Sequence, residues 1–145
     1  MALNQVKILG RAPLGPVRQA QPLYAADVPA GFPSPADDYI DCHLDLHEHL
    51  IKHPAATFYV RVSGTSMVGA GIHNGDLLIV DRAVQPRDGH VIVAVVEGEL
   101  VVKRLRRRLG RIDLVSDSDA YPPLAITEDM DLHVWGVCRY VIHGL

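Results

Sequence analysis

The 145-residue sequence has no apolar run that approaches the ~20 residues of a membrane-spanning helix. Its first 25 residues contain Lys7, Arg11 and Arg18 but no apolar block of the kind found in signal peptides. The sequence also contains no internal repeat and no low-complexity tract. We therefore expect a soluble, cytoplasmic, globular protein.

Cysteine is scarce and the charge is nearly balanced. Cys42 and Cys138 are too few for a disulfide framework, and in a reducing compartment we expect both to be free core residues. A net charge of −3 argues against a general nucleic-acid coat. The length is sufficient for one domain to bury a core without disulfides or a metal.

Proline divides the chain into two parts. Because proline fixes its own backbone and pushes the preceding residue out of the helical region, residues 1–38 are predicted to form an extended N-terminal arm. A compact domain is expected over residues 39–145. Six of the ten prolines lie in the arm, at Pro13, Pro16, Pro22, Pro29, Pro33 and Pro35.

The second part is predicted to be mostly β. A short helix is expected around Leu44–Ile51, before His53-Pro54. Closely spaced turns at Asn74-Gly75, Asp88-Gly89 and Glu97-Gly98 favour antiparallel pairing of the segments between them. The expected strands, rich in Val, Ile, Leu and aromatic residues, are Thr57–Val62, Asp76–Asp81, His90–Val96, Glu99–Leu105, Ile112–Val115 and Leu132–Ile142.

Ser66 lies in a context that suits a nucleophile. It follows Ser63-Gly64-Thr65, where a predicted strand runs into a turn of small residues. A serine nucleophile needs a neighbouring base and backbone N–H groups that hold the oxyanion, and the N–H groups of Thr65, Ser66 and Met67 are local candidates. A serine beside a glycine is also ordinary in a turn without any catalytic role.

Lys103 could supply the base. In a strand, Val101, Lys103 and Leu105 share one face, so apolar neighbours could shelter the amine and lower its pKa. The alternative is a lysine on an edge strand whose amine lies in water and protects the edge from aggregation.

Ala30-Gly31 is a candidate substrate bond within the same chain. Pro29 and Pro33 flank it and keep it extended, and its two small side chains leave the carbonyl open to attack. The 35 residues from Gly31 to Ser66 could span on the order of 100 Å when extended, which permits cleavage in cis and equally in trans.

Four segments together resemble the LexA/UmuD family of self-cleaving proteins, in the family's order and over about residues 28–143. They are Ala30–Ala36, Ser63–Met67, Gly71–Asp81 and Val102–Leu105. The resemblance is stronger to UmuD than to LexA, because 30 residues before the Ala30-Gly31 bond are too few for a helix-turn-helix domain. One departure is that UmuD proteins can carry cysteine before the scissile glycine, whereas Ala-Gly is the LexA-type pair.

The resemblance implies a fold, an activity and partners. It implies a mostly-β catalytic domain of antiparallel strands, with Ser66 as nucleophile, Lys103 as general base and cleavage between Ala30 and Gly31. It further implies a role in the SOS response, in which the cut form is a subunit of an error-prone translesion polymerase. The implied partners are a homodimer mate, a UmuC-like polymerase and a RecA–single-stranded DNA filament that promotes cleavage. It implies no cofactor and no metal.

Two alternatives remain open. Within the family, the chain could be a LexA-like or phage-repressor fragment. Outside it, the chain could be an interaction module with an idle dyad. The presence of Ser66, Lys103 and an intact Ala30-Gly31 bond favours self-processing.

Two other clusters are weaker candidates. His43, His47, His49 and His53 include helical i, i+4 pairs, but they lack the H-E-x-x-H pattern and the pairs point to different helix faces, so we expect solvated histidines. Arg104–Arg111 is a basic segment around Leu109-Gly110, which we interpret as a solvated hairpin turn with at most a modest role in binding a partner.

Overall fold

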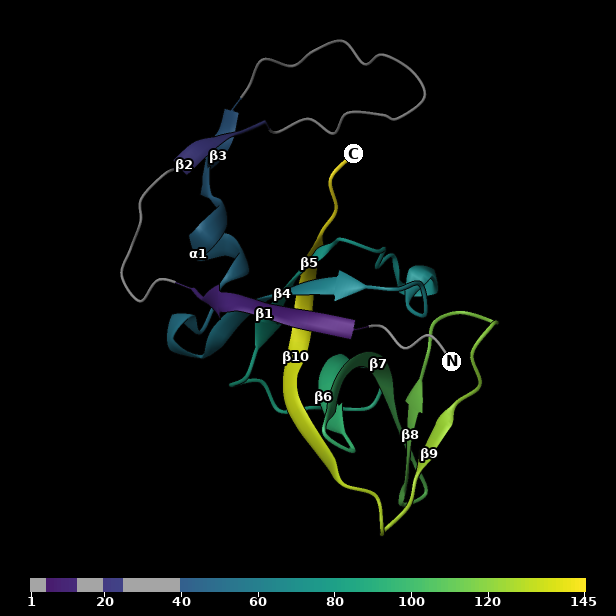
Figure 1. Ribbon diagram of the computed structural model, residues 1–145. Coiled ribbons are helices and arrows are strands. Elements are labelled where there is room, and N and C mark those ends of the chain that lie inside the picture. Colours follow the sequence, from purple (N-terminus) through teal and green to yellow (C-terminus); the bar gives the residue numbers. More distant parts are fainter. Residues whose placement is uncertain (1–4, 13–19, 25–39) are drawn as a thin grey trace.

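A computed structural model describes residues 5–12, 20–24 and 40–145 (Figure 1). Strands dominate these residues, and the few helices are short. In chain order the elements are β1 (Gln5–Arg11), β2 (Ala20–Tyr24), β3 (Ile40–Asp45), α1 (Leu46–Leu50), η1 (Pro54–Ala56), β4 (Thr57–Ser63), η2 (Val68–Ala70), β5 (Leu77–Asp81), β6 (Val91–Val96), β7 (Glu99–Arg108), β8 (Arg111–Val115), β9 (Leu124–Ile126) and β10 (Leu132–Ile142).

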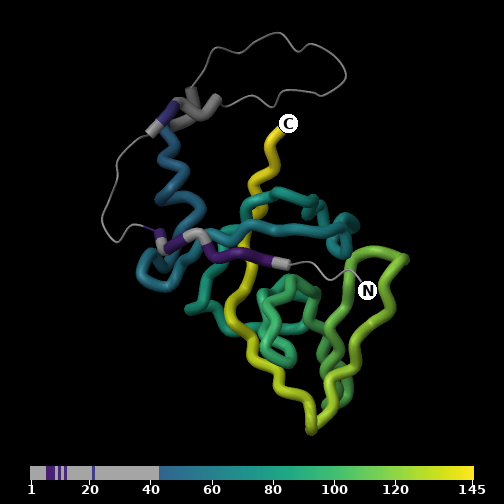
Figure 2. The backbone as a smooth tube through the Cα atoms, viewed as in Figure 1, coloured from purple at the N-terminus to yellow at the C-terminus, as the bar shows by residue number. Residues whose placement is uncertain are grey.

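Eight strands form one antiparallel sheet in the order β1-β4-β5-β10-β6-β7-β8-β9. The sheet curls, because Gln5 of β1 also pairs with Val101 of β7, and so six strands close on themselves. The long strand β10 links the two halves by pairing with β5 on one side and β6 on the other (Figures 1 and 2). The predicted mostly-β, antiparallel fold is confirmed.

Tight turns set the register of the strands that carry the site. Glu97 and Gly98 (φ 49° and 81°) connect β6 to β7, and Leu109 and Gly110 (φ 51° and 74°) connect β7 to β8. Two successive positive φ angles are typical of the hairpin turns that match the twist of antiparallel strands. The hairpin predicted at Leu109-Gly110 is therefore present.

The core consists of two main clusters of buried side chains. Both draw on β6 and β7, whose residues alternate between the two faces of the sheet. One cluster contains Val60, Val62, Met67, Ile72, Leu78, Val80, Val93 and Val102, and the other contains Ile92, Ala94, Val96, Val101, Leu105, Leu114 and Val137.

The structure changes some details of the prediction. The helix begins at Leu46 and not at Leu44, because Asp45 caps it: Asp45 Oδ1 accepts from the backbone N–H of His47 at 3.0 Å and of Glu48 at 3.3 Å. Leu44 instead lies in β3, which pairs with β2 in a separate two-stranded sheet. The short strand β9 was not predicted, because its three residues show no alternation.

Within residues 1–38, β1 pairs with β4 in the main sheet and β2 pairs with β3. The division into an arm and a domain at residue 38 stays a prediction. Cys138 is free, as expected, and burial raises the pKa of its thiol to about 12. In the part of the chain that the structure describes, every helix is too short or too polar to cross a bilayer.

Candidate active site

Ser66 lies in the turn between β4 and η2. Gly64 has a φ of 101°, which lets the chain leave β4 sharply, and its N–H donates to Asn74 Oδ1 at 3.0 Å. The backbone N–H of Ala70 donates to the Met67 carbonyl at 3.0 Å, which closes the next turn. This local structure buries the side chains of both Ser66 and Met67 completely.

Lys103 lies in the middle of β7, opposite Ile92 of β6. It is only 4% exposed, as is its neighbour on the same face, Val101. The alternative of an edge lysine with its amine in water is therefore wrong, because β6 and β8 flank β7 on both sides.

The structure brings Ser66 and Lys103 together. Lys103 Nζ donates to Ser66 Oγ at 3.2 Å and to Ser116 Oγ at 2.6 Å. Ser116 follows β8 and is also buried. The three polar side chains come from three separate segments and meet beneath the surface, with Lys103 between the two serines.

The surroundings of Lys103 favour its neutral form. Burial lowers the pKa of the Lys103 amine. Across residues 5–12, 20–24 and 40–145, no carboxylate forms an ion pair with the Lys103 amine, so no ion pair offsets the effect of burial on its pKa. The centroid of the Tyr121 ring lies 5.7 Å from Nζ.

Asp117 fixes the segment that carries Ser116. Its carboxylate accepts from Arg104 Nε at 3.0 Å and from Arg104 Nη2 at 2.5 Å, while Arg104 Nη1 donates to the Gly89 carbonyl at 2.6 Å. The backbone of Asp117 also accepts from the Gly69 N–H at 2.6 Å. Asp117 thus joins the turn after Ser66, strand β7 and the segment after β8.

A pocket of about 570 Å³ lies beside these residues. It is lined by Val68 and Gly69 on one side and by 116–120 on the other. Since Ser116 both lines the pocket and contacts Lys103, a peptide bound there would lie next to the buried amine.

The other predicted site residues have different outcomes. Thr65, Ser66 and Met67 form the turn described above, but whether their N–H groups hold an oxyanion stays a prediction. Ala30 and Gly31 lie outside the described residues. Sequence reasoning missed Ser116 and Asp117, although the polar run 116–119 that follows a strand was a signal for a loop.

The histidines near α1 do not form a metal site in the described part of the chain. His53 Nδ1 instead lies 2.6 Å from Asp81 Oδ2, and the Thr57 hydroxyl donates to the His53 carbonyl at 2.7 Å, so His53 fixes the start of β4. The described residues that do gather as possible metal ligands are His73, Asp76 and His143, which the sequence reasoning missed.

The basic segment is partly neutralised. Arg104 pairs with Asp117, and Arg106 pairs with Asp113 of the neighbouring strand. Leu109, at the tip of the hairpin, is fully exposed. This agrees with the interpretation as a hairpin turn.

The chain is similar to a known protein family and to several known proteins. Residues 22–139 match the family model described as Peptidase S24-like. The chain is 45% identical to Protein SamA of Salmonella typhimurium over 128 residues, which cover 88% of this chain and 89% of that protein. It is 45% identical to Protein ImpA of Escherichia coli over 132 residues, 90% of this chain and 89% of that protein. It is 42% identical to Protein MucA of Escherichia coli over 125 residues, 86% of this chain and 83% of that protein.

Proposed function

Because the chain belongs to the Peptidase S24-like family, we propose that Ser66 and Lys103 are its catalytic dyad and that the dyad cuts the Ala30-Gly31 bond. The wider activity is that of a UmuD-like, self-cleaving serine peptidase of the SOS response.

One observation supports the dyad above all others, namely the 3.2 Å contact between Ser66 Oγ and a buried lysine amine. A neutral amine has two N–H groups and one lone pair. One N–H donates to Ser116 Oγ, and the lone pair then accepts the proton of the Ser66 hydroxyl. Ser116 is thus a positioning residue, which orients the lone pair toward Ser66.

The reaction proceeds in two steps. Ser66 Oγ transfers its proton to Lys103 Nζ and attacks the Ala30 carbonyl carbon, and the backbone N–H groups of Thr65, Ser66 and Met67 hold the resulting oxyanion. As the C–N bond breaks, the Lys103 ammonium returns the proton to the Gly31 amine. Lys103 then deprotonates a water molecule, whose oxygen attacks the carbonyl carbon of the ester between Ser66 and residue 30, and the Lys103 ammonium returns that proton to Ser66 Oγ as the ester C–O bond breaks.

The open pocket beside the dyad suits the residues that flank the bond. It lies between η2 and 116–120, and a segment with small side chains at the bond could lie there with its carbonyl close to Ser66. Pro29 and Pro33 favour the extended conformation that such a segment needs.

We further propose that the cut form acts as a dimeric accessory subunit of a UmuC-like translesion polymerase and that a RecA–single-stranded DNA filament promotes the cut. The apolar end of β10 supports the dimer, because Tyr140 and Ile142, two positions apart in the strand, are 42% and 47% exposed.

Mass spectrometry of the purified chain after alkaline incubation tests the proposed bond. We expect two products that end at Ala30 and begin at Gly31, and no products from an Ala30→Trp variant whose bulky side chain obstructs the site. Products from any other bond would contradict the assignment of the cleavage site.

A further inference from the structure

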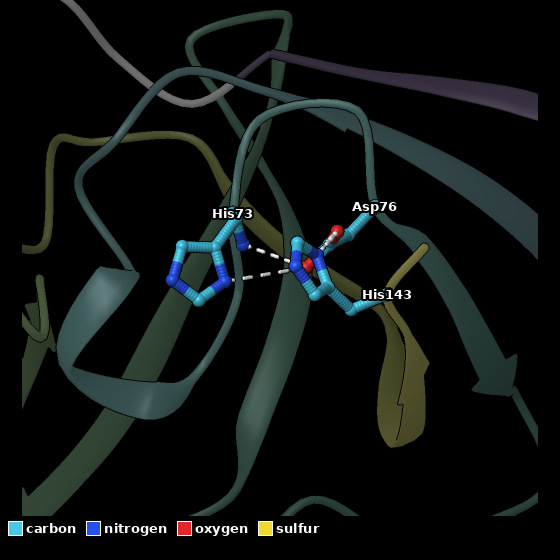
Figure 3. Close-up of side chains that lie close together, drawn as sticks. All are labelled: His73, Asp76 and His143. Atoms are coloured by element: carbon cyan, nitrogen blue, oxygen red, sulfur yellow. Dashed lines mark hydrogen bonds and ion pairs between the residues drawn. The ribbon is translucent and has the colours of Figure 1, made fainter. Parts of the chain in front are cut away.

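His73, Asp76 and His143 lie together on the side of the sheet where β5 begins and β10 ends (Figure 3). Asp76 immediately precedes β5, and His143 immediately follows β10. Because Leu77 pairs with Ile142 in the antiparallel register, Asp76 and His143 are the next pair along the two strands. The register therefore sets this meeting of residues that are 67 positions apart.

The contacts converge on the carboxylate. His143 Nδ1 lies 2.6 Å from Asp76 Oδ1, and His73 Nδ1 lies 3.7 Å from Asp76 Oδ2. The centroids of the two imidazole rings are 4.9 Å apart, and one ligand atom from each of the three residues lies within 4.8 Å of the others. Figure 3 shows the imidazole rings of His73 and His143 beside the Asp76 carboxylate.

Burial differs between the carboxylate and the imidazoles in a way that suits an ion entering from the surface. The Asp76 side chain is 3% exposed, while those of His73 and His143 are 50% and 47% exposed. Asp76 Oδ2 accepts from the backbone N–H of His73 at 2.7 Å, which restricts the orientation of the carboxylate. Such second contacts to a ligating group are typical of metal sites.

We propose that His73, Asp76 and His143 bind a divalent transition-metal ion of the zinc type. Two imidazoles and one carboxylate are a known donor set for such ions, whereas Mg²⁺ and Ca²⁺ prefer oxygen ligands alone. Two ligands of a tetrahedral zinc ion, at bonds of about 2.0–2.1 Å, lie about 3.3 Å apart. The observed separations are 2.6 Å from His143 Nδ1 to Asp76 Oδ1 and 3.7 Å from His73 Nδ1 to Asp76 Oδ2, and the three ligand atoms lie within 4.8 Å of one another. Rotation of the half-exposed imidazole rings would adjust these separations to the distance that zinc requires.

Three protein ligands leave one tetrahedral position for water or for a side chain of a partner. Binding would also fix the loop between β4 and β5 to the end of β10. That loop contains Asn74, whose Oδ1 accepts from the Gly64 N–H in the turn that leads to Ser66. A bound ion would therefore stabilise the loop that supports the nucleophile's turn, independently of whether Ser66 is catalytic.

Isothermal titration calorimetry of the untagged full chain with ZnCl₂, and with MgCl₂ in parallel, tests the site. We expect one zinc ion per chain and no heat from magnesium. His73→Ala and His143→Ala should each weaken zinc binding about tenfold or more. A His43→Ala/His47→Ala double variant should bind zinc as the unsubstituted chain does, because these two histidines lie in β3 and α1 and are not among the proposed ligands.

Absorption spectra with Co²⁺ in place of zinc give a second measurement. We expect intense bands of a tetrahedral ion, lost in His143→Ala. Because both histidines are half exposed, their replacement should leave the fold intact, which circular dichroism checks. The proposal is wrong if zinc fails to bind at millimolar concentration, or if the His43/His47 variant loses binding while His73→Ala and His143→Ala keep it.

Discussion

The backbone N–H of Gly69 donates to the carbonyl oxygen of Asp117 at 2.6 Å, and a Cβ atom at residue 69 would lie 2.5 Å from the same oxygen. The turn after Ser66 therefore packs directly against the segment that carries Ser116. Any side chain at residue 69 would push the two segments apart and disturb the contact between Lys103 and both serines.

Gly69→Ala should accordingly lower stability by about 1–3 kcal/mol, the usual cost of overpacking. It should also slow self-cleavage, because Ser116 moves with Asp117. Gly144→Ala is the matched control, since a Cβ there meets nothing within 4 Å. Urea denaturation and cleavage gels measure both effects, and a Gly69→Ala chain as stable as the Gly144→Ala chain would contradict the packing argument.

Ser66→Ala and Lys103→Arg should both abolish self-cleavage. The first removes the nucleophile, and the second replaces the base with a guanidinium that stays protonated at usable pH. Gel electrophoresis should show only the 145-residue chain, in place of fragments of 30 and 115 residues (145 − 30). Fragments of those sizes from either variant would mean that another group performs the reaction.

Ser116→Ala should slow self-cleavage about tenfold without abolishing it, which corresponds to the loss of one hydrogen bond that orients the Lys103 amine. Ser118→Ala is the control, because Ser118 lines the same pocket but its hydroxyl accepts from the Ala120 N–H, whereas Lys103 donates to Ser66 and Ser116. If Ser116 had a purely structural role, Ser116→Ala would lower thermal stability without changing the self-cleavage rate of the folded protein. Rates measured well below the melting temperature separate the two cases.

The segment Ser66–Lys103 illustrates what the sequence could and could not predict. Alternation in β7 placed Lys103 among apolar residues, and the glycine turn placed Ser66 at a strand end, so both candidates were available before the fold. Neither pattern predicts that Ser66 and Lys103 lie close together, because the two residues are 37 positions apart and meet only when the sheet closes.

Ser116 and the cluster of His73, Asp76 and His143 were not predicted from the sequence for a related reason. Ser116 lies in an ordinary polar loop, and its role depends on β7 and β8 forming a hairpin that brings it to Lys103. Asp76 and His143 become neighbours through the register of β5 and β10, and no local pattern encodes that pairing. The helix begins later than predicted because the Asp45 side chain caps it and accepts from its first N–H groups, which have no acceptor within the helix.

The pH dependence of self-cleavage should identify the base. Only neutral Lys103 accepts the proton of Ser66, so the rate should rise about tenfold per pH unit until the amine is mostly deprotonated and should then level off. Because burial lowers the pKa of Lys103, the midpoint should lie below the ordinary lysine value of 10.5. Initial rates from pH 6 to 11 measure this, and a rate already constant at pH 7 would count against lysine as the base.

Activation by a RecA filament should change how often the bond reaches Ser66 and not the chemistry there. A 100-fold rise in the docked population requires about 2.7 kcal/mol of preferential binding to the docked state, so the filament need not contribute a catalytic group. We therefore expect the filament at neutral pH and alkaline incubation without it to cut the same Ala30-Gly31 bond, and Ser66→Ala to resist both. Mass spectrometry of the two digests compares the bonds. Cutting of Ser66→Ala in the presence of the filament would mean that a group other than the Ser66 hydroxyl supplies the nucleophile, and so would contradict the proposed dyad.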